Sequence, residues 1–275
     1  MTGPRTLAIE PLTKAGFALF GVVIERAGAE IRMINEGTTT RYHALSQVDV
    51  AAGGGMPILS IFAATPRPAP IAVSMMERHP AVIERALSDG HEIASHGWRW
   101  INYHGMAEDE ERAQLQKAID VHTSVCGERP LGWYTGRTSQ NTRRIVAEEG
   151  GFLYDADDYS DDLPFWSTQT DTPHLIVPYT LDTNDMRFAT AQGFHTGDQF
   201  ATYLIDAFDT LYAEGETSPK MMSVGLHCRL IGRPARFAGL VRFLDHVQKH
   251  DRVWLARRID IARHWREHHP HGIAL

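Results

Sequence analysis

Two patterns of hydrophobic and polar positions follow one another along the chain. The first eighty residues hold short apolar runs that are separated by turn-forming stretches such as AAGGG and TPRPAP. Short runs between such turns predict several strands and little helix, as in part of a β-sandwich or barrel. The predicted strands contain Leu7–Ile9, Val22–Ile24, Pro57–Phe62 and Ile71–Met75.

From Pro80 onward, helical and strand patterns alternate. The segment PAVIERALSDG predicts a helix with Pro80 in its first turn and Gly90 at its end, and SQNTRRIVAEEGG predicts a helix capped by Ser139. Further helices are predicted in AEDEERAQLQKAIDVHTSVCG, DQFATYLIDAFDTLYAEG, ARFAGLVRFLDHVQKHD and RIDIARHWREHH. Strands are predicted in HEIASHG, LGWYTG, FLYDAD, LIVPYT, MMSVGLHC and RVWLAR.

This alternation indicates a parallel α/β sheet or barrel, in which the active site lies at the carboxyl ends of the strands. Polar and aromatic clusters follow five successive predicted strands. These clusters are SHGWRW, GWYTGRTS, DADDYSDD, PYTLDTNDMRF and LHCRLIGRP. Packing alone does not explain so many clusters at the same end of the strands, so we expect a substrate pocket there.

Composition narrows the class of protein and its partners. The chain has 275 residues, 43% hydrophobic and 22% charged, which is typical of a globular protein with one large domain or two smaller ones. It has neither an apolar run of about eighteen residues nor a signal-peptide pattern, so we expect no membrane span. A net charge of −7 without a basic tract argues against a nucleic-acid partner. Cys126 and Cys228 have no metal-site spacing and imply no disulfide framework, which fits a reducing cytoplasm.

Four long segments carry a family resemblance. They are EIASHGWRWINY, GERPLGWYTGRTSQNTRRIVAEEGGFLYDADDYSDDLPFW, PHLIVPYTLDTNDMRFAT and KMMSVGLHCRLIGRPARFAGLVRFLDHVQ. Together they resemble the metal-independent allantoinase branch of the polysaccharide deacetylase family. The resemblance implies a distorted (β/α) barrel and hydrolysis of a non-peptide C–N bond. In that reaction the hydantoin ring of allantoin opens to allantoate during purine breakdown.

The segments LAIEPLTKAGFALFGVVIE and INEGTTTRYHALSQVDVAAGGGMPILSIFAATPRPAPIAVSMMERHP resemble a different family. They are similar to the N-terminal half of ureidoglycolate lyase, a cupin-like β-barrel that releases urea and glyoxylate from ureidoglycolate. The two resemblances imply a fusion. We expect a β-rich lyase-like fragment at residues 1–78 and, at 79–275, an allantoinase-like α/β domain that lacks the first strands of its barrel.

Three functions are compatible with these resemblances. Allantoinase-type hydrolysis of a small-molecule substrate is the leading expectation, and ureidoglycolate lyase activity is the runner-up. The third interpretation is a catalytically inactive fusion of two pathway enzymes. A homo-oligomer is compatible with the sequence, which contains no feature that decides the oligomeric state.

The resemblance also bears on metal binding. Members of the wider family bind a metal through an early aspartate and an H-x-x-x-H pair. His96 matches the first histidine of that pair, but Trp100 occupies the second position and offers zinc no ligand atom. We therefore expect no metal and no cofactor. The remaining histidine cluster lies on a predicted terminal helix and tail and is interpreted as solvated; it consists of His264, His268, His269 and His271.

Opening an amide-like ring requires an activated water, stabilisation of the oxyanion and a proton for the leaving nitrogen. His227, after MMSVGL, matches the family's late histidine and is the first candidate acid or base, with His96 as the second. A structural or orienting role is the alternative for each histidine. Arg137 and Arg229 can bind the oxyanion or the ureido carbonyl with paired donors, unless they pair with nearby aspartates.

Carboxylates and aromatic rings complete the predicted site. Asp185 is assigned to catalysis and Asp182 to substrate binding, although both can also be ordinary loop residues. Five aromatic side chains are expected to wall the flat ring, with simple packing as the alternative. They are Trp98, Trp100, Tyr103, Trp133 and Tyr134. Because His96 and His227 follow different strands, we expect them to face one shared cleft.

Overall fold

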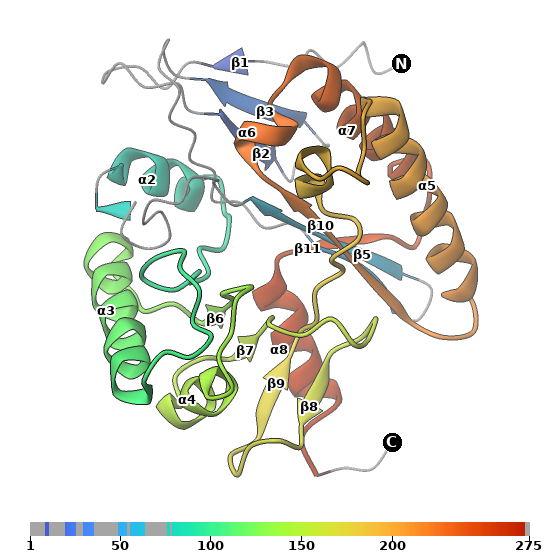
Figure 1. Ribbon diagram of the computed structural model, residues 1–275. Coiled ribbons are helices and arrows are strands. Elements are labelled where there is room, and N and C mark those ends of the chain that lie inside the picture. Colours follow the sequence, from blue (N-terminus) through green and yellow to red (C-terminus); the bar gives the residue numbers. More distant parts are fainter. Residues whose placement is uncertain are drawn as a thin grey trace. The chain divides into compact units, whose positions relative to one another are not determined.

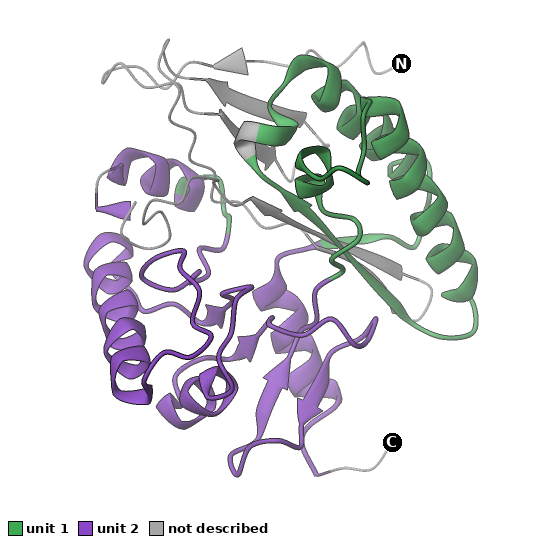
Figure 2. Ribbon diagram, in the orientation of Figure 1, with its two compact units in different colours: residues 1–66, 88–91, 180–255 green, residues 67–87, 92–179, 256–275 purple. Residues whose placement is uncertain are grey.

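The chain divides into two compact units, which are described separately (Figure 1, Figure 2). Unit 1 comprises residues 1–66, 88–91 and 180–255, and unit 2 comprises residues 67–87, 92–179 and 256–275. The computed structural model describes residues 76–77 and 79–272, except for the side chains of Cys228 and Arg229. Ahead of these it describes only the backbone of five strands between Ile9 and Ala63.

Strands from both ends of the chain pair in unit 1. β10 (Lys220–Leu226) pairs in parallel with β5 (Met56–Ala63) and antiparallel with β4 (Asp49–Gly53). β11 (Trp254–Ala256) completes this four-stranded sheet. A three-stranded sheet has the order β1-β3-β2, formed by Ile9–Glu10, Glu30–Asn35 and Phe20–Glu25.

Two long amphipathic helices, α5 (Gly197–Glu214) and α7 (Pro234–Val247), build the core of unit 1 together with β10. α5 begins with a capping box, in which the side chains of Thr196 and Gln199 each accept a hydrogen bond from the other residue's backbone N–H. The apolar stripes of these elements are buried against one another. They include Phe200, Leu204 and Phe208 of α5, Leu240, Phe243 and Leu244 of α7, and Met222, Val224 and Leu226 of β10.

Glycines let α5 and α7 approach closely, and the two helices run side by side in Figure 1. A Cβ atom on Gly239 would lie 2.1 Å from the carbonyl oxygen of Gly197. A Cβ atom on Gly197 would lie equally close, 2.1 Å, to the carbonyl oxygen of Ala235. The backbones are therefore in contact at this crossing, and no larger residue fits without a shift of one helix.

Unit 2 contains a second sheet, with the strand order β6-β7-β9-β8. β6 (Gly132–Trp133), β7 (Tyr154–Asp155) and β9 (His174–Ile176) are parallel, whereas β8 (Phe165–Ser167) is antiparallel to β9. The helices of this unit are α2 (Pro80–Ser88), α3 (Glu108–Cys126), α4 (Thr142–Glu149) and α8 (Arg258–His268). Among the helices that the structure describes, none has the length and apolar character needed to cross a membrane.

The predicted α/β class is confirmed, and each helix predicted after Pro80 is present. One predicted cap is wrong. The N-cap of α4 is Asn141, without a side-chain cap bond, and Ser139 instead donates its hydroxyl to the buried carboxylate of Glu111. The predicted strand HEIASHG is reduced to an isolated bridge at Ser95, and the antiparallel strand β8 was not predicted.

Of the predicted cupin-like fold of residues 1–78, the structure describes the backbone of β1 to β5 and residues 76–77, and the predicted strand at Ile71–Met75 lies outside the described residues. Three described strands, β1, β2 and β5, overlap the other apolar runs of that segment. The predicted boundary between residues 78 and 79 stays a prediction, and unit 1 contains strands from both sides of it.

Candidate active site

Parallel strand segments in unit 2 end at one edge of the sheet. The register pairs Ser95 with Trp133, Trp133 with Asp155, and Asp155 with Ile176. Because these segments run in the same direction, the residues that follow them gather at the same edge. Those residues include His96, Tyr134, Asp157 and Tyr179.

Tyr134 lies at the centre of an aromatic cluster on this edge. The rings of His96 and Tyr134 meet edge to face, with centroids 5.1 Å apart. Tyr179 stacks on Tyr134 at 5.2 Å, and the hydroxyl of Tyr159 lies 3.3 Å from that of Tyr134. Burial, followed by the neighbouring Tyr179, raises the pKa of Tyr134 well above its ordinary value. The cluster thus presents aromatic faces and a protonated phenol beside a histidine.

A buried arginine fixes the segment that carries Tyr179. Arg258, the first residue of α8, is fully buried and donates to the carbonyl oxygens of Val177 at 2.6 Å and Pro178 at 2.9 Å. Its guanidinium also lies 5.7 Å from the ring centroid of Tyr179. Sequence reasoning did not identify this residue, because a single arginine at a helix start carries no distinctive pattern.

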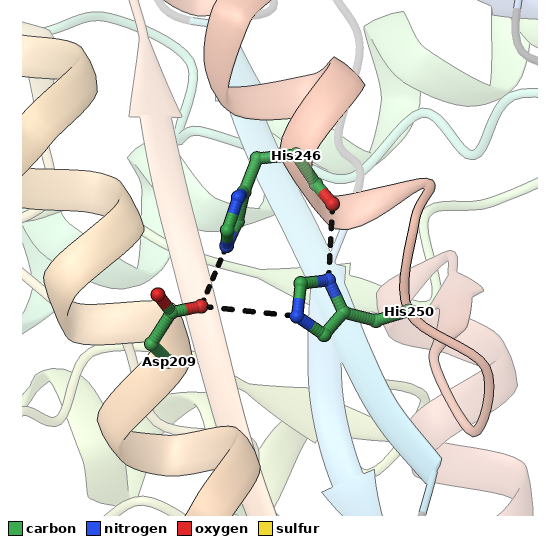
Figure 3. Close-up of side chains that lie close together, drawn as sticks. All are labelled: Asp209, His246 and His250. Carbon is green, nitrogen blue, oxygen red and sulfur yellow. Dashed lines mark hydrogen bonds and ion pairs between the residues drawn. The ribbon is translucent and has the colours of Figure 1, made fainter.

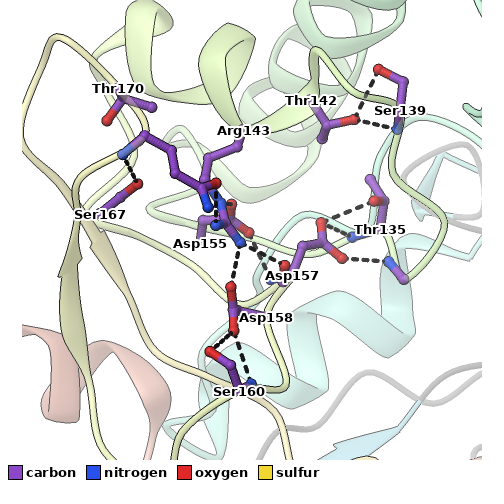
Figure 4. A network of polar contacts seen from close by, with 12 residues as sticks. Thr135, Ser139, Thr142, Arg143, Asp155, Asp157, Asp158, Ser160, Ser167 and Thr170 are labelled. Carbon is purple, nitrogen blue, oxygen red and sulfur yellow. Dashed lines mark hydrogen bonds and ion pairs between the residues drawn. The ribbon is translucent and has the colours of Figure 1, made fainter.

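The carboxylate of Asp157, after β7, holds the loop after β6 (Figure 4). Its Oδ2 atom accepts hydrogen bonds from the backbone N–H of Thr135 at 2.8 Å and the hydroxyl of Thr135 at 2.9 Å. Its Oδ1 atom accepts a bond from the backbone N–H of Gly136 at 2.6 Å. The adjacent Asp158 receives the guanidinium of Arg143, from α4, at 2.7 Å. Two loops of the candidate site are therefore fixed by carboxylates.

Asp155 is a buried acid within the same network. Its Oδ1 atom accepts the backbone N–H of Asp157 at 2.8 Å, and Nε of Arg143 lies 3.9 Å from its Oδ2 atom. Burial, together with the nearby charge of Asp157, raises the pKa of Asp155 to about 8. Burial also raises the pKa of Asp157, and its three hydrogen bonds oppose that shift by favouring the ionised form.

Two tryptophans predicted to wall the substrate are covered by cationic side chains. Arg99 and Lys117 lie over the ring of Trp98, at 3.9 and 3.8 Å from its centroid. Arg137 lies 3.9 Å above the centroid of Trp100. Arg137 is thus engaged with an aromatic face, in a contact worth about 0.5–1 kcal/mol at an exposed position.

Tyr103 and Trp133, also predicted at the substrate, are each only 1% exposed. Trp133 packs edge-on against Phe152, with centroids 5.3 Å apart. The hydroxyl of Tyr103 lies against Gly97, where an added Cβ atom would be 2.6 Å away, and burial raises the pKa of this phenol. These are the contacts of packed core residues, which was the alternative interpretation of both aromatic side chains.

In unit 1, the two predicted catalytic residues His227 and Asp185 form a hydrogen-bonded pair. His227 follows β10, and Asp185 is the first residue of the 3-10 helix η1 (Asp185–Ala189). Nδ1 of His227 lies 2.6 Å from Oδ1 of the buried Asp185. The Oδ2 atom of Asp185 accepts the backbone N–H groups of His227 at 2.8 Å and Ile231 at 3.0 Å. Burial raises the pKa of Asp185, and the contacts from His227 and Ile231 oppose that shift.

Two threonines anchor the loop that carries Asp185. The hydroxyl of Thr180 accepts the backbone N–H of Ser223, in β10, at 3.0 Å. The hydroxyl of Thr183 donates to the carbonyl oxygen of the same serine. Since Ser223 lies in the strand that leads to His227, these contacts hold the carboxylate and the imidazole in register. The sequence signal for them was the threonine-rich cluster PYTLDTNDMRF.

Three further predicted site residues are Asp182, Arg229 and His96. Asp182 is exposed, and its carboxylate accepts the hydroxyl of Tyr203 at 2.8 Å. The side chain of Arg229 lies outside the described residues. His96 belongs to unit 2 and His227 to unit 1, so their shared cleft stays a prediction.

Trp100 supplies no ligand atom beside His96, and these residues do not fit the metal site of the wider family.

Comparison with known families matches both parts of the chain. A family model described as ureidoglycolate lyase matches residues 4–83. A second model, described as polysaccharide deacetylase, matches residues 69–152. The two matched ranges overlap around residue 78, where the sequence predicts the junction between the two resemblances.

Individual relatives extend these matches. A Schizosaccharomyces pombe protein described as a polysaccharide deacetylase is 42% identical over 213 residues, which cover 71% of this chain and 67% of that protein. The solved structure of Puue allantoinase is 59% identical, with a TM-score of 0.71, and the match covers 73% of this chain and 67% of that one. The ureidoglycolate lyase of Burkholderia mallei is 54% identical over 76 residues. That match covers 28% of this chain and 45% of the lyase, so less than half of the lyase's length is represented.

Proposed function

We propose that this chain, which belongs to the polysaccharide deacetylase family, is an allantoinase-type hydrolase. In the proposed reaction it opens the hydantoin ring of allantoin. Its family and its similarity to a solved allantoinase support a hydrolase, and its N-terminal part carries ureidoglycolate lyase sequence. The observation that carries the proposal is the His227–Asp185 pair, in which a buried carboxylate orients a partly exposed imidazole.

This pair can perform the proton transfers that hydrolysis of a cyclic amide requires. With Nδ1–H directed at Asp185, the Nε2 atom of His227 accepts a proton from the attacking water. The new C–O bond places the carbonyl electrons on oxygen as a tetrahedral oxyanion. When the C–N bond breaks, the imidazolium returns its proton to the leaving nitrogen and the ring opens to allantoate. Asp185 stabilises the imidazolium during the interval between the two transfers.

The aromatic side chains at the sheet edge of unit 2 suit the binding of a flat, uncharged substrate. The faces of Tyr134 and Tyr179 match the planar hydantoin and ureido groups of allantoin in shape. The phenol of Tyr134 stays protonated at neutral pH because its pKa is raised, and it can donate a hydrogen bond to a ureido carbonyl. We therefore propose Tyr134 as a substrate-binding residue.

Ureidoglycolate lyase activity is the second candidate, because residues 4–83 match that family's model. The matched segment represents 45% of the length of the Burkholderia enzyme. A chain with neither activity would be a fusion that retains folded parts of two pathway enzymes without their chemistry.

The test is an assay of the purified full chain with allantoin and with ureidoglycolate in separate reactions, before and after washing with chelator. We expect allantoate from allantoin, and a loss of roughly 10² or more in rate for His227→Ala. His195→Ala, at an exposed histidine of the same unit, is the matched control and should retain the parent rate. Turnover of ureidoglycolate alone would establish the second candidate. Turnover of neither substrate by folded protein would establish the inactive fusion.

A further inference from the structure

Three side chains of unit 1 that are absent from the proposed hydrolytic chemistry converge at the end of α7 (Figure 3). Asp209 comes from the middle of α5, His246 from the last turn of α7, and His250 from the residues just after that helix. One potential ligand atom from each lies within 4.8 Å of the other two. Oδ1 of Asp209 is 2.6 Å from Nε2 of His246 and 4.0 Å from Nε2 of His250.

The tautomer of His250 is fixed by a backbone contact. Its Nδ1 atom lies 3.0 Å from the carbonyl oxygen of His246, which can only accept, so Nδ1 carries the proton. In the neutral ring, the Nε2 atom is then unprotonated and carries a lone pair, and this atom faces the carboxylate of Asp209 (Figure 3). Two acceptors that face each other repel unless a cation or a proton lies between them. An Nδ1–H donated to a backbone carbonyl is also the usual support of a metal-bound histidine.

Aromatic neighbours hold the two imidazoles in place. The ring of Phe208 contacts His250 at a centroid distance of 5.0 Å and His246 at 5.9 Å. Tyr212 contacts His250 at 4.8 Å. Both histidines are half-buried, whereas Asp209 is exposed, so solvent can complete the coordination of an ion. Rings that are already oriented lose little conformational entropy when a ligand binds.

The distances suit a small divalent ion. Tetrahedral ligands placed roughly 2.0–2.1 Å from zinc are separated from each other by about 3.3 Å. The observed separations of 2.6 and 4.0 Å lie on either side of that value, and a small rotation of the Asp209 side chain would equalise them. Two imidazoles and one carboxylate form the ligand set preferred by zinc and cobalt rather than by magnesium or calcium.

We propose that Asp209, His246 and His250 bind one divalent transition-metal ion of the zinc class, which links α5 to the C-terminal end of α7. The site is independent of His96 and of the metal position of the wider family, and it departs from the sequence-based expectation that the chain binds no metal. The sequence signal was the pair of histidines in HVQKH, four residues apart at a helix end, but the carboxylate that completes the set comes from another helix.

Cobalt titration of the chelator-washed full chain tests this proposal, with the visible absorption of bound Co²⁺ as the readout. We expect saturable binding of one ion per chain, displaced by Zn²⁺, and a rise in the Tm that follows metal concentration. His246→Gln, His250→Gln and Asp209→Asn should each weaken binding at least tenfold. The matched control is the double variant His264→Gln and His268→Gln, because that pair is also spaced by four residues, on α8, with ring centroids 4.4 Å apart. The control should bind cobalt as the parent does.

Circular dichroism of each variant establishes that it is folded. X-ray absorption at the zinc edge of the unmodified protein adds a readout that needs no variant, and scattering from two imidazoles is expected. The proposal is overturned by the lack of saturable binding at millimolar cobalt, or by binding that survives both histidine substitutions. Loss of binding in the control alone, or a zinc spectrum without imidazole scattering, also overturns it.

Discussion

Nδ1 of His227 lies 2.6 Å from Oδ1 of Asp185, although the two residues are 42 positions apart in the sequence. The same carboxylate accepts two backbone N–H groups from the turn that begins at His227. A histidine whose ring and backbone are bound by one buried carboxylate has a fixed orientation before substrate arrives. This geometry is preorganisation of the kind that lowers the cost of reaching a transition state.

The first prediction concerns Asp185 as a positioning residue. Asp185→Asn keeps the size of the side chain but removes the charge that stabilises the imidazolium and selects its tautomer. If the chain hydrolyses allantoin, kcat should fall on the order of 10² or more, while KM stays within about threefold. Steady-state kinetics measure both constants. Asp198→Asn, at an exposed carboxylate near the start of α5, is the control and should keep both. A large rise in KM with kcat unchanged in Asp185→Asn would contradict the assigned positioning role.

The second prediction concerns the crossing of α5 and α7. In an ordinary helix interior, Gly→Ala is stabilising by about 1 kcal/mol. At Gly239 the new Cβ atom would meet the carbonyl oxygen of Gly197 at 2.1 Å, so we expect the opposite sign. Gly239→Ala should lower the free energy of unfolding by roughly 1–3 kcal/mol. Urea unfolding measures the change, and Thr202→Ala, on the exposed side of α5, should stay within about 0.5 kcal/mol of the parent. A more stable Gly239→Ala protein would show that the helices can separate without cost.

The third prediction is a pH dependence from a buried histidine. Burial lowers the pKa of His122, on α3, from 6.5 to about 4. Between these values the unfolded chain binds a proton that the folded chain excludes, so this residue destabilises the fold as pH falls from about 6.5 toward 4. Replacing it by leucine should remove roughly 2 kcal/mol of the stability lost between pH 7.5 and pH 5.

Chemical unfolding at the two pH values, for the parent and for His122→Leu, measures this difference. His104→Leu, at an exposed histidine, is the control and should retain the parent's pH dependence. A pH dependence that is the same in the parent and in His122→Leu would mean that the buried ring accepts its proton within the folded protein.

The fourth prediction concerns Arg258. Its guanidinium donates to the carbonyl oxygens of Val177 and Pro178, and both of these residues are buried. Arg258→Met fills similar space but leaves both acceptors without these donors, and should lower the free energy of unfolding by roughly 2–4 kcal/mol. Thermal and urea unfolding give the magnitude. Arg266→Met, on the same helix but half-exposed, is the control and should cost clearly less. Equal losses for the two variants would mean that burial of the guanidinium does not matter.

Periodic patterns predicted the helices well. On α5, the stripe that contains Phe200, Leu204 and Phe208 is buried as its spacing indicates, because one face of a helix repeats every three to four residues. Tyr203, predicted on the same stripe, is 36% exposed and binds Asp182, since it lies at the border of the buried face. The short strands were harder to predict from the sequence, because two residues such as those of β6 are too few to show an alternation of apolar and polar positions.

The candidate site was predicted residue by residue but not as a set of contacts. His227 and Asp185 were both named as candidates from the sequence, yet nothing local to either residue encodes their pairing across 42 positions. Trp133 and Tyr134 are neighbours that were assigned the same role. Trp133 ends β6 and is buried in the core, whereas Tyr134 follows the strand and lies at the sheet edge. The partners of Asp157 required the register of β6 against β7, which no spacing along the chain supplies.

The hydrogen bonds that Asp157 accepts from the backbone N–H groups of Thr135 and Gly136 have a consequence for attempts to re-engineer the molecule. The segments after β6 and β7 behave as one exchangeable block rather than as two modules, because a side chain of the second serves as the backbone support of the first. A graft that replaces only the β6 segment keeps a charged acceptor whose donors depend on the new backbone shape. A graft that replaces only the β7 segment deprives two amides of their acceptor. Recombination with relatives should therefore place its crossover points before residue 132 and after residue 160, so that both segments come from the same parent.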